Sequence, residues 1–155
     1  MTHMGQIRQF DHVGITVSDL DAAAAFFETL GFAPENRMMM EGEFVDAVIG
    51  IPGSRSEILT LRLPGGGTSV ELSCFVHPEH TTGSAAPMST EVGIRNLCFE
   101  VDDLHEIVER LAQAGYGLVG GIGEWEGAWR MTYVRGPDGI IVALAENLGR
   151  DEGTG

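Results

Sequence analysis

The chain has 155 residues, of which 43% are hydrophobic and 21% charged, and this balance is that of a globular domain rather than of a disordered or collagen-like chain. Its 23 acidic residues against 9 basic ones give a formal net charge of −14, which disfavours nucleic acid and anionic membrane surfaces as partners. All nine basic residues are arginine, so a Schiff-base lysine and a phosphate-binding P-loop are excluded.

The sequence also indicates a compartment. It contains no apolar run near the roughly 18 residues that a membrane span needs, and its first ten residues lack the basic start and apolar run of a signal peptide. The two cysteines, Cys74 and Cys98, form neither a CxxC pair nor a disulfide framework. We therefore expect a soluble, cytoplasmic protein with free thiols.

Two segments of the chain resemble each other. Residues 10–32 and 94–116 align without a gap, with Asp19 on Asp103 at an offset of 84. Each segment begins with apolar residues at alternate positions, which predicts a half-buried strand, and continues with an aspartate that can cap a helix. Apolar residues at helical spacing follow, and a glycine ends each predicted helix.

Each segment is followed by a matching tail. Residues 60–66 (TLRLPGG) align with residues 133–139 (YVRGPDG), and each tail predicts a strand that enters a Pro/Gly turn and leaves as another strand. Each half of the chain is thus predicted to hold a strand, a helix and about three further strands. We place module 1 at about residues 8–79, the linker at about 80–92 and module 2 at about 93–148, within one domain of residues 1–155.

This doubled pattern resembles the vicinal oxygen chelate superfamily, which includes glyoxalase I, methylmalonyl-CoA epimerase, extradiol dioxygenases, fosfomycin-modifying enzymes and bleomycin-resistance binding proteins. The resemblance rests on DHVGITVSDLDAAAAFF (11–27), SVELSCF (69–75), GIRNLCFEVDDL (93–104) and YVRGPDGIIVALAE (133–146). It implies an α+β fold in which two tandem βαβββ modules form a cupped half-barrel sheet around one cavity. One fold serves many chemistries here, so function has to be argued from the site.

The resemblance further implies a divalent metal site built from the first and last strands of each module. The corresponding positions in this sequence are His12 and Glu71 in module 1, and Asn96 and Ala143 in module 2. Catalytic divalent sites usually take three or four protein ligands, and only His12 and Glu71 are of the usual kinds. We therefore expect no cofactor, and name Zn, Ni, Co, Mn or Fe at His12 and Glu71 as the alternative.

No other residue is a strong candidate to bind the metal in place of Asn96 or Ala143. Glu146 lies three residues after Ala143, and strand alternation places the two on opposite faces of the sheet. His77 and His80, in the sequence FVHPEH, form only a weak pattern beside a proline.

Strand alternation predicts a polar face that gathers residues from both modules. The predicted ligand-binding residues on it, together with two tryptophans of the segment GEWEGAWRMTY, are His12, Thr16, Glu71, Ser73, Asn96, Cys98, Trp125 and Trp129. Aromatic side chains there can stack on a planar ligand. The alternatives are a face that is simply exposed to solvent, a carboxylate of Glu71 that pairs with Arg62, and tryptophans that pack in the core or in a dimer contact.

Two functions from different classes follow. The first is a small-molecule-binding protein, similar to the bleomycin-resistance branch, which sequesters an aromatic or natural-product-like ligand in a metal-free cavity. The second is an enzyme: either a metal-dependent glyoxalase, epimerase or dioxygenase that uses His12 and Glu71, or a metal-free tailoring enzyme in which these two residues are the catalytic acid–base pair. The resemblance also implies a homodimer.

Overall fold

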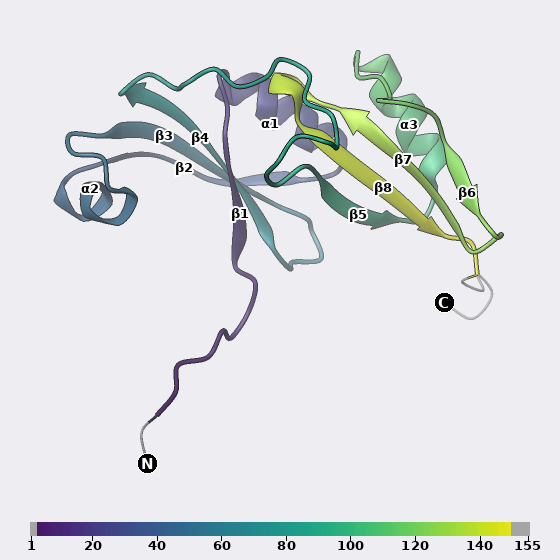
Figure 1. Cartoon of the computed structure of the whole chain (residues 1–155), viewed down its shortest axis with the longest axis horizontal. Helices are drawn as coiled ribbons and strands as arrows, with labels where there is room; N and C mark the ends of the chain where they lie inside the picture. The colour runs from purple at the N-terminus through teal and green to yellow at the C-terminus, as the bar shows by residue number, and fades with distance from the viewer. Residues whose placement is uncertain (1–2, 150–155) are drawn as a thin grey trace. The chain divides into compact units, whose positions relative to one another are not determined.

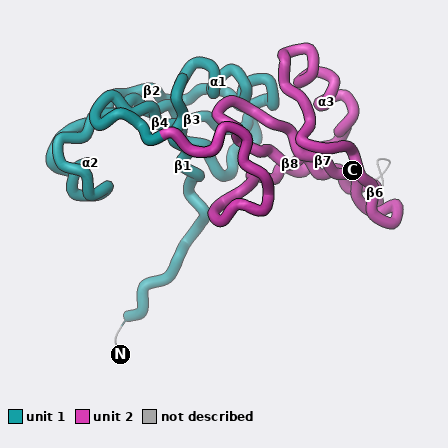
Figure 2. Tube along the Cα trace, turned by 45° about the horizontal axis from the view of Figure 1, so that its top comes forward, with its two compact units in different colours: residues 1–81 teal, residues 82–155 magenta. Residues whose placement is uncertain are grey.

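The computed structural model describes residues 3–149. The chain divides into two compact units, Met1–Thr81 and Thr82–Gly155, which are drawn in teal and magenta in Figure 2. Each unit is described by itself below. The single domain and the module boundaries predicted above stay predictions.

Unit 1 contains four strands and two helices (Figure 1). The elements are β1 (His12–Thr16), α1 (Leu20–Thr29), β2 (Ala33–Glu41), α2 (Glu43–Ile49), β3 (Arg55–Arg62) and β4 (Ser69–His77). The sheet has the order β1-β4-β3-β2, in which β1 is parallel to β4 and the other neighbours are antiparallel. Both β1 and β2 are therefore edge strands.

Unit 2 repeats this plan, except that its described residues contain no counterpart of α2. Its elements are β5 (Leu97–Val101), α3 (Leu104–Gln113), β6 (Gly123–Trp125), β7 (Trp129–Arg135), a 3-10 turn (Pro137–Gly139) and β8 (Ile141–Asn147). The sheet order is β5-β8-β7-β6, again with one parallel pair, β5 with β8. The predicted α+β fold with two βαβββ sets is confirmed, and the two four-stranded mixed sheets are not closed.

The predicted helix caps are also confirmed. The carboxylate of Asp19 accepts a hydrogen bond from the amide of Ala22 at 3.0 Å, and that of Asp103 accepts one from the amide of Glu106 at 3.2 Å. These bonds satisfy amide groups that have no partner inside the first turn of a helix. Gly31 (φ 105°) follows α1, and Gly115 (φ 98°) follows α3. Both glycines have the positive φ that ends a helix.

Helix α2 was not predicted from the sequence. It is only seven residues long, and its N-cap residue, Gly42, makes no side-chain capping bond. Isolated helices shorter than about 12 residues are marginal in water, and this segment has acidic residues in its first turn but no capping side chain before it.

Each unit has its own apolar core between its helix and its sheet. In unit 1 the buried side chains include Phe26, Phe27 and Phe32, whose rings pack edge to face at centroid distances of 5.3 and 5.6 Å. In unit 2 Leu104 and Leu111 of α3 are fully buried. Burying one such side chain contributes roughly 1.5–3 kcal/mol, so these contacts hold each helix on one face of its sheet.

Candidate functional site

The face of each sheet that lies away from its helix is called the distal face below. In unit 1, burial alternates along β1, with exposed His12, Gly14 and Thr16 between half-buried Val13 and Ile15. The exposed set therefore lies on the distal face, as strand alternation predicted.

The parallel register of β1 and β4 brings the predicted polar residues of unit 1 together. Gly14 is the partner of Glu71, and Thr16 is the partner of Ser73. Because Gly14 carries no side chain, the Glu71 carboxylate lies beside the His12 ring. The closest atoms, His12 Nε2 and Glu71 Oε2, are 3.6 Å apart.

His12 lies between two carboxylates. Its Nδ1 contacts Asp11 Oδ2 at 2.8 Å, while Nε2 faces Glu71. The hydrogen bond to Asp11 is the largest effect and raises the pKa of His12. Burial lowers the pKa, and the charges of Glu71 and Asp11 each raise it by less than burial lowers it; the net shift is upward. The ring is thus held as an imidazolium over a wider pH range than a free histidine.

Arg62 has other partners than Glu71. Its Nε donates to the Glu35 carboxylate at 2.9 Å, and its Nη1 donates to the carbonyl of Gly67 at 2.6 Å. Glu71 instead forms an ion pair with His12. The Arg62–Glu71 pair considered as an alternative is therefore wrong, and the Glu71 carboxylate faces the predicted site.

Unit 2 has a neutral arrangement at the equivalent place. Cys98 is the partner of Ala143 across β5 and β8, and Ala143 is the partner of Tyr133 across β7 and β8. Ala143 thus holds the register position that Glu71 holds in unit 1. The Asn96 amide donates a hydrogen bond to the Tyr133 hydroxyl at 3.4 Å. An amide and a methyl group therefore stand where unit 1 has the histidine and the carboxylate, and the amide contacts a phenol.

Tyr133 is a residue that the sequence reasoning missed. Its counterpart in unit 1 is Thr60, which is the partner of Glu71. The aligned tails, TLRLPGG and YVRGPDG, already place Tyr133 on Thr60, so the signal was present in the sequence. What was absent was the parallel pairing of β5 with β8, which brings Asn96 close to the Tyr133 phenol.

Tyr133 belongs to a row of aromatic and sulfur-containing side chains along β7. Alternation places Trp129, Met131 and Tyr133 on one face of the strand, away from buried Thr132 and Val134. Trp125 of β6 is the register partner of Trp129 and is exposed. The two predicted tryptophans are therefore neighbours on the distal face of unit 2.

Cys98 is an exposed free cysteine on the same face. Partial burial raises the pKa of its thiol above the ordinary value, because the charged form is poorly solvated there. The side chain suits a contact surface for a ligand rather than a nucleophile.

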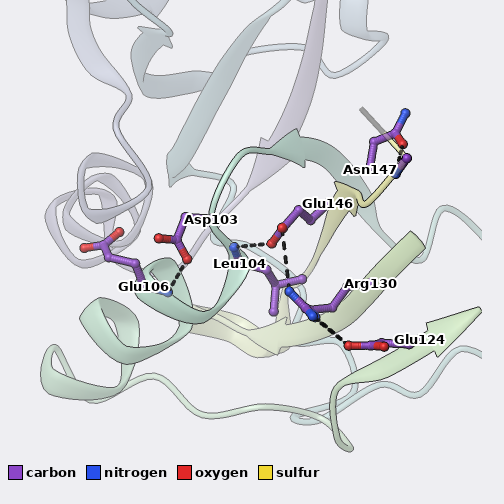
Figure 3. A network of polar contacts seen from close by, with 8 residues as sticks. Asp103, Leu104, Glu106, Glu124, Arg130, Glu146 and Asn147 are labelled. Atoms are coloured by element: carbon purple, nitrogen blue, oxygen red, sulfur yellow. Dashed lines mark hydrogen bonds and ion pairs between the residues drawn. The ribbon is translucent and has the colours of Figure 1, made fainter. Parts of the chain in front are cut away.

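Glu146 lies on the opposite face, as alternation predicted. Its carboxylate accepts a hydrogen bond from the amide of Leu104 at the start of α3, at 2.8 Å, and lies 3.6 Å from Arg130 Nη1 (Figure 3). Arg130 in turn pairs with Glu124 at 2.7 Å. Glu146 is thus a structural partner of α3 and does not replace Glu71 in unit 2.

The comparisons with known proteins identify the family. The model of the Glyoxalase/Bleomycin resistance protein/Dioxygenase superfamily matches residues 9–144. The chain belongs to this superfamily. A search of curated proteins found no match.

Solved structures of the superfamily agree with this assignment. A glyoxalase family protein from Bacillus cereus is 34% identical, with a TM-score of 0.90 over 96% of this chain and 100% of that one. The trypanothione-dependent glyoxalase I of Leishmania major is 19% identical, with a TM-score of 0.64 over 90% of this chain and 87% of that one. An antibiotic-binding protein from a Streptomyces species is 21% identical, with a TM-score of 0.61 over 94% and 99%. The last two show the fold alone.

The donor set is a poor fit to the divalent metal of the superfamily. Within residues 3–149, no three or more His, Cys, Asp or Glu side chains gather closely enough to hold a metal ion. His12 and Glu71 supply two donors, whereas catalytic divalent sites usually take three or four from protein. The equivalent positions of unit 2 supply a methyl group and an amide, and the amide already contacts Tyr133.

None of the helices among the described residues is long and apolar enough to span a membrane.

Proposed function

We propose that this superfamily member is a small-molecule-binding protein that sequesters an aromatic or natural-product-like ligand without a metal. The observation that carries the proposal is the replacement of the second donor pair by Asn96, Tyr133 and Ala143. An amide, a phenol and a methyl group suit hydrogen bonding and contact with an organic ligand, and suit a zinc, nickel or iron ion poorly.

The aromatic row of unit 2 supports the chemical class of the ligand. Trp125 and Trp129 present large apolar rings with a hydrogen-bond donor at one edge, and Met131 adds a polarisable side chain that adapts to irregular shapes. Offset stacking between aromatic rings contributes about 0.5–1.5 kcal/mol beyond the buried area. One structure with this fold is that of an antibiotic-binding protein, which agrees with such a ligand.

In this proposal the remaining polar residues orient the ligand. His12, held between Asp11 and Glu71, donates to an acceptor on the ligand, and the Glu71 carboxylate accepts from a donor. The full set of proposed contact residues is His12, Thr16, Glu71, Ser73, Asn96, Cys98, Trp125 and Trp129, to which we add Tyr133 because its hydroxyl contacts Asn96. Both cysteines are free thiols, in keeping with the cytoplasmic location that we propose.

The second candidate is an enzyme centred on His12 and Glu71. The 3.6 Å separation of their side-chain atoms favours it, because both could contact one metal ion or exchange a proton with one substrate. The metal branch predicts a glyoxalase, epimerase or dioxygenase. The metal-free branch uses His12 and Glu71 as the catalytic acid–base pair.

Tryptophan fluorescence separates these functions. The chain has only two tryptophans, so titration with planar aromatic natural products reports on Trp125 and Trp129 directly. We expect saturable quenching that a chelator does not change, with the compound recovered intact by mass spectrometry. Product formation, or loss of binding with the chelator, would favour the enzyme.

A histidine variant with a matched control sharpens the test. His12→Ala removes one polar contact, so we expect the ligand affinity to fall by about 1–3 kcal/mol while binding persists. His105→Ala, an exposed histidine on α3, should leave the affinity unchanged. Complete loss of function in His12→Ala alone is the result that the enzyme requires.

A further inference from the structure

Strand β6 is weakly held by the core of unit 2. It stands at the edge of the sheet, where it pairs with β7, and it is only three residues long. All three residues are exposed, so apolar burial does not anchor the strand. It nevertheless carries Trp125, one of the two tryptophans proposed to contact the ligand, and this residue is 64% exposed. Contacts other than apolar packing therefore have to fix the position of Trp125.

A row of three charged side chains crosses the sheet on its helix face. Glu124 of β6 is the register partner of Arg130 on β7, and Arg130 is in turn the register partner of Glu146 on β8. The guanidinium donates to Oε1 of Glu124 through Nε at 2.9 Å and through Nη2 at 2.7 Å. Its Nη1 lies 3.6 Å from Oε2 of Glu146, and Figure 3 shows Arg130 between the two carboxylates. Arg130 therefore connects the edge strand β6 to β8.

The far end of this row is fixed on helix α3. Oε1 of Glu146 accepts a hydrogen bond from the amide of Leu104, the first residue of α3, at 2.8 Å. The side chain of Arg130 is 22% exposed, whereas that of Glu124 is 52% exposed. A planar guanidinium presents its donors in a rigid fork, so an anchored Arg130 gives the Glu124 carboxylate one preferred position. The row therefore ties β6 to the start of α3.

Trp125 lies on the other face of β6, next to this row. It follows Glu124 in the chain, and its register partner is Trp129 on β7. Because successive side chains alternate between the faces of a strand, the carboxylate that holds β6 and the ring proposed to meet the ligand lie back to back. The turn after β6 is closed by the amide of Ala128, which donates to the carbonyl of Trp125 at 2.8 Å, a backbone contact that does not involve the ring. A displacement of β6 at Glu124 would therefore move the Trp125 ring.

The contact between Glu124 and Arg130 is better suited to fixing geometry than to adding stability. Ion pairs that reach solvent contribute little to the free energy of folding, because water already solvates both charges and ordering two long side chains costs entropy. Glu124 is half exposed, so its ion pair is of this kind. Ordering a binding group before the ligand arrives, in contrast, lowers the entropy cost of association.

We propose that Arg130 is a positioning residue for ligand binding. By holding β6 through Glu124, it keeps the Trp125 ring beside that of Trp129, so that an aromatic ligand stacks without first ordering the strand. Arg130 itself lies on the helix face and does not touch the ligand. The gain in affinity rests on the function proposed above, whereas the ordering of Trp125 by Arg130 does not depend on any ligand.

Time-resolved fluorescence anisotropy tests the ordering of Trp125 without a ligand. In a Trp129→Phe background Trp125 is the only tryptophan of the sequence, and its nanosecond depolarisation reports local motion of the ring. We expect Arg130→Met and Glu124→Ala each to increase the amplitude of the fast depolarisation. Arg110→Met, which removes the ion pair with Glu106 on α3, should leave it unchanged. A Trp125 that is as ordered in Arg130→Met and Glu124→Ala as in the background chain would overturn the proposal.

The Glu124→Ala variant separates this effect from a loss of folding. Arg130→Met leaves Glu146 without its cation and can lower stability, whereas Glu124→Ala keeps the contact of Arg130 with Glu146. Its midpoint of urea denaturation should therefore stay close to that of the wild type while Trp125 becomes more mobile. A large fall in the midpoint together with the change in anisotropy would show that Glu124 supports the fold, and would contradict the positioning role.

A double-mutant cycle tests the effect on affinity. Proflavine, a planar aromatic dye, is the probe, and quenching of tryptophan fluorescence gives its dissociation constant. We expect Arg130→Met and Glu124→Ala to raise this constant by roughly 2- to 10-fold, the share that one stacked ring contributes. In a Trp125→Ala background, read through Trp129, the same changes should have no further effect. An equal loss with and without Trp125 would mean that Arg130 acts on the fold rather than through the ring.

The two experiments fail in different ways. No quenching of the wild type by proflavine or by another planar aromatic compound would contradict the proposed function, and the anisotropy of Trp125 would then decide the role of Arg130 alone. Normal quenching in the wild type, with unchanged affinity and anisotropy in Arg130→Met and Glu124→Ala, would instead remove the positioning role and leave the proposed function standing.

Discussion

The two units share one order of a helix and four strands, and they differ in the side chains on both faces of the sheet. On the distal face, unit 1 has His12 and Glu71 where unit 2 has Asn96 and Ala143. On the helix face the carboxylate is in unit 2 instead, where the last strand has Glu146 and the last strand of unit 1 has Cys74. The carboxylate of the last strand therefore lies beside His12 in unit 1 and binds the start of the helix in unit 2.

The helix face of unit 1 has a thiol at the position of Glu146. Cys74, the counterpart of Glu146, contacts the carbonyl of Ser18 through its sulfur at 3.6 Å. Glu146 instead accepts from the first amide of α3 and pairs with Arg130. Helix attachment therefore depends on a charged network in unit 2 and on apolar packing with one weak sulfur contact in unit 1.

The largest expected effect is on stability. Glu146→Ala leaves the Leu104 amide without its acceptor and removes the carboxylate beside Arg130, so the free energy of unfolding should fall by about 1–3 kcal/mol in urea denaturation. Cys74→Ala, the matched change in unit 1, should cost less than about 1 kcal/mol because thiols make weak hydrogen bonds. Equal losses in the two variants would show that the helix faces do not differ as described.

The next effect is on ligand affinity. Tyr133→Phe removes the hydroxyl that contacts Asn96 and keeps the ring, so the dissociation constant of a quenching ligand should rise by roughly 2- to 10-fold. Tyr116→Phe alters the only other tyrosine of the sequence and serves as the control. If both variants bind like the wild type, Asn96 and Tyr133 do not form part of the ligand contact.

Titration of His12 by NMR sharpens the distal-face comparison. Its pKa should lie above the free value near 6.5, and Asp11→Asn should lower it more than Glu71→Gln, because the Asp11 hydrogen bond is the larger cause. A raised pKa means that folding favours the protonated ring. This contribution to stability is complete below pH about 6.5 and is lost as the pH rises through the pKa of the folded protein. A larger fall in the His12 pKa for Glu71→Gln than for Asp11→Asn would show that the charge of Glu71 is the larger cause.

The smallest effect concerns Cys98. Burial raises the pKa of its thiol, so alkylation of Cys98 in a Cys74→Ala background should be slower at neutral pH than that of a model thiol. Mass spectrometry of the alkylated protein over time gives the rate. Labelling as fast as the model thiol would indicate a thiolate and reopen a nucleophilic role.

Much of the fold was predictable because the repeat is gapless through strand, turn and helix. That alignment placed His12 on Asn96, and strand alternation alone put Glu146 on the helix face. The Asn96–Tyr133 contact was not predictable in this way, since it depends on the pairing of β5 with β8 in addition to the predicted hairpin of β7 and β8. Helix α2 escaped prediction because seven residues without a capping side chain carry almost no periodic signal.

The central claim, that the protein acts without a bound metal, is tested most directly by elemental analysis. Untagged protein is measured as isolated, and again after incubation with Zn, Ni, Co, Mn or Fe(II) followed by dialysis. We predict that no stoichiometric metal is retained, and that ligand quenching is the same before and after. One tightly held metal per chain, lost in both His12→Ala and Glu71→Gln, would contradict the account and assign these two residues to a metal centre.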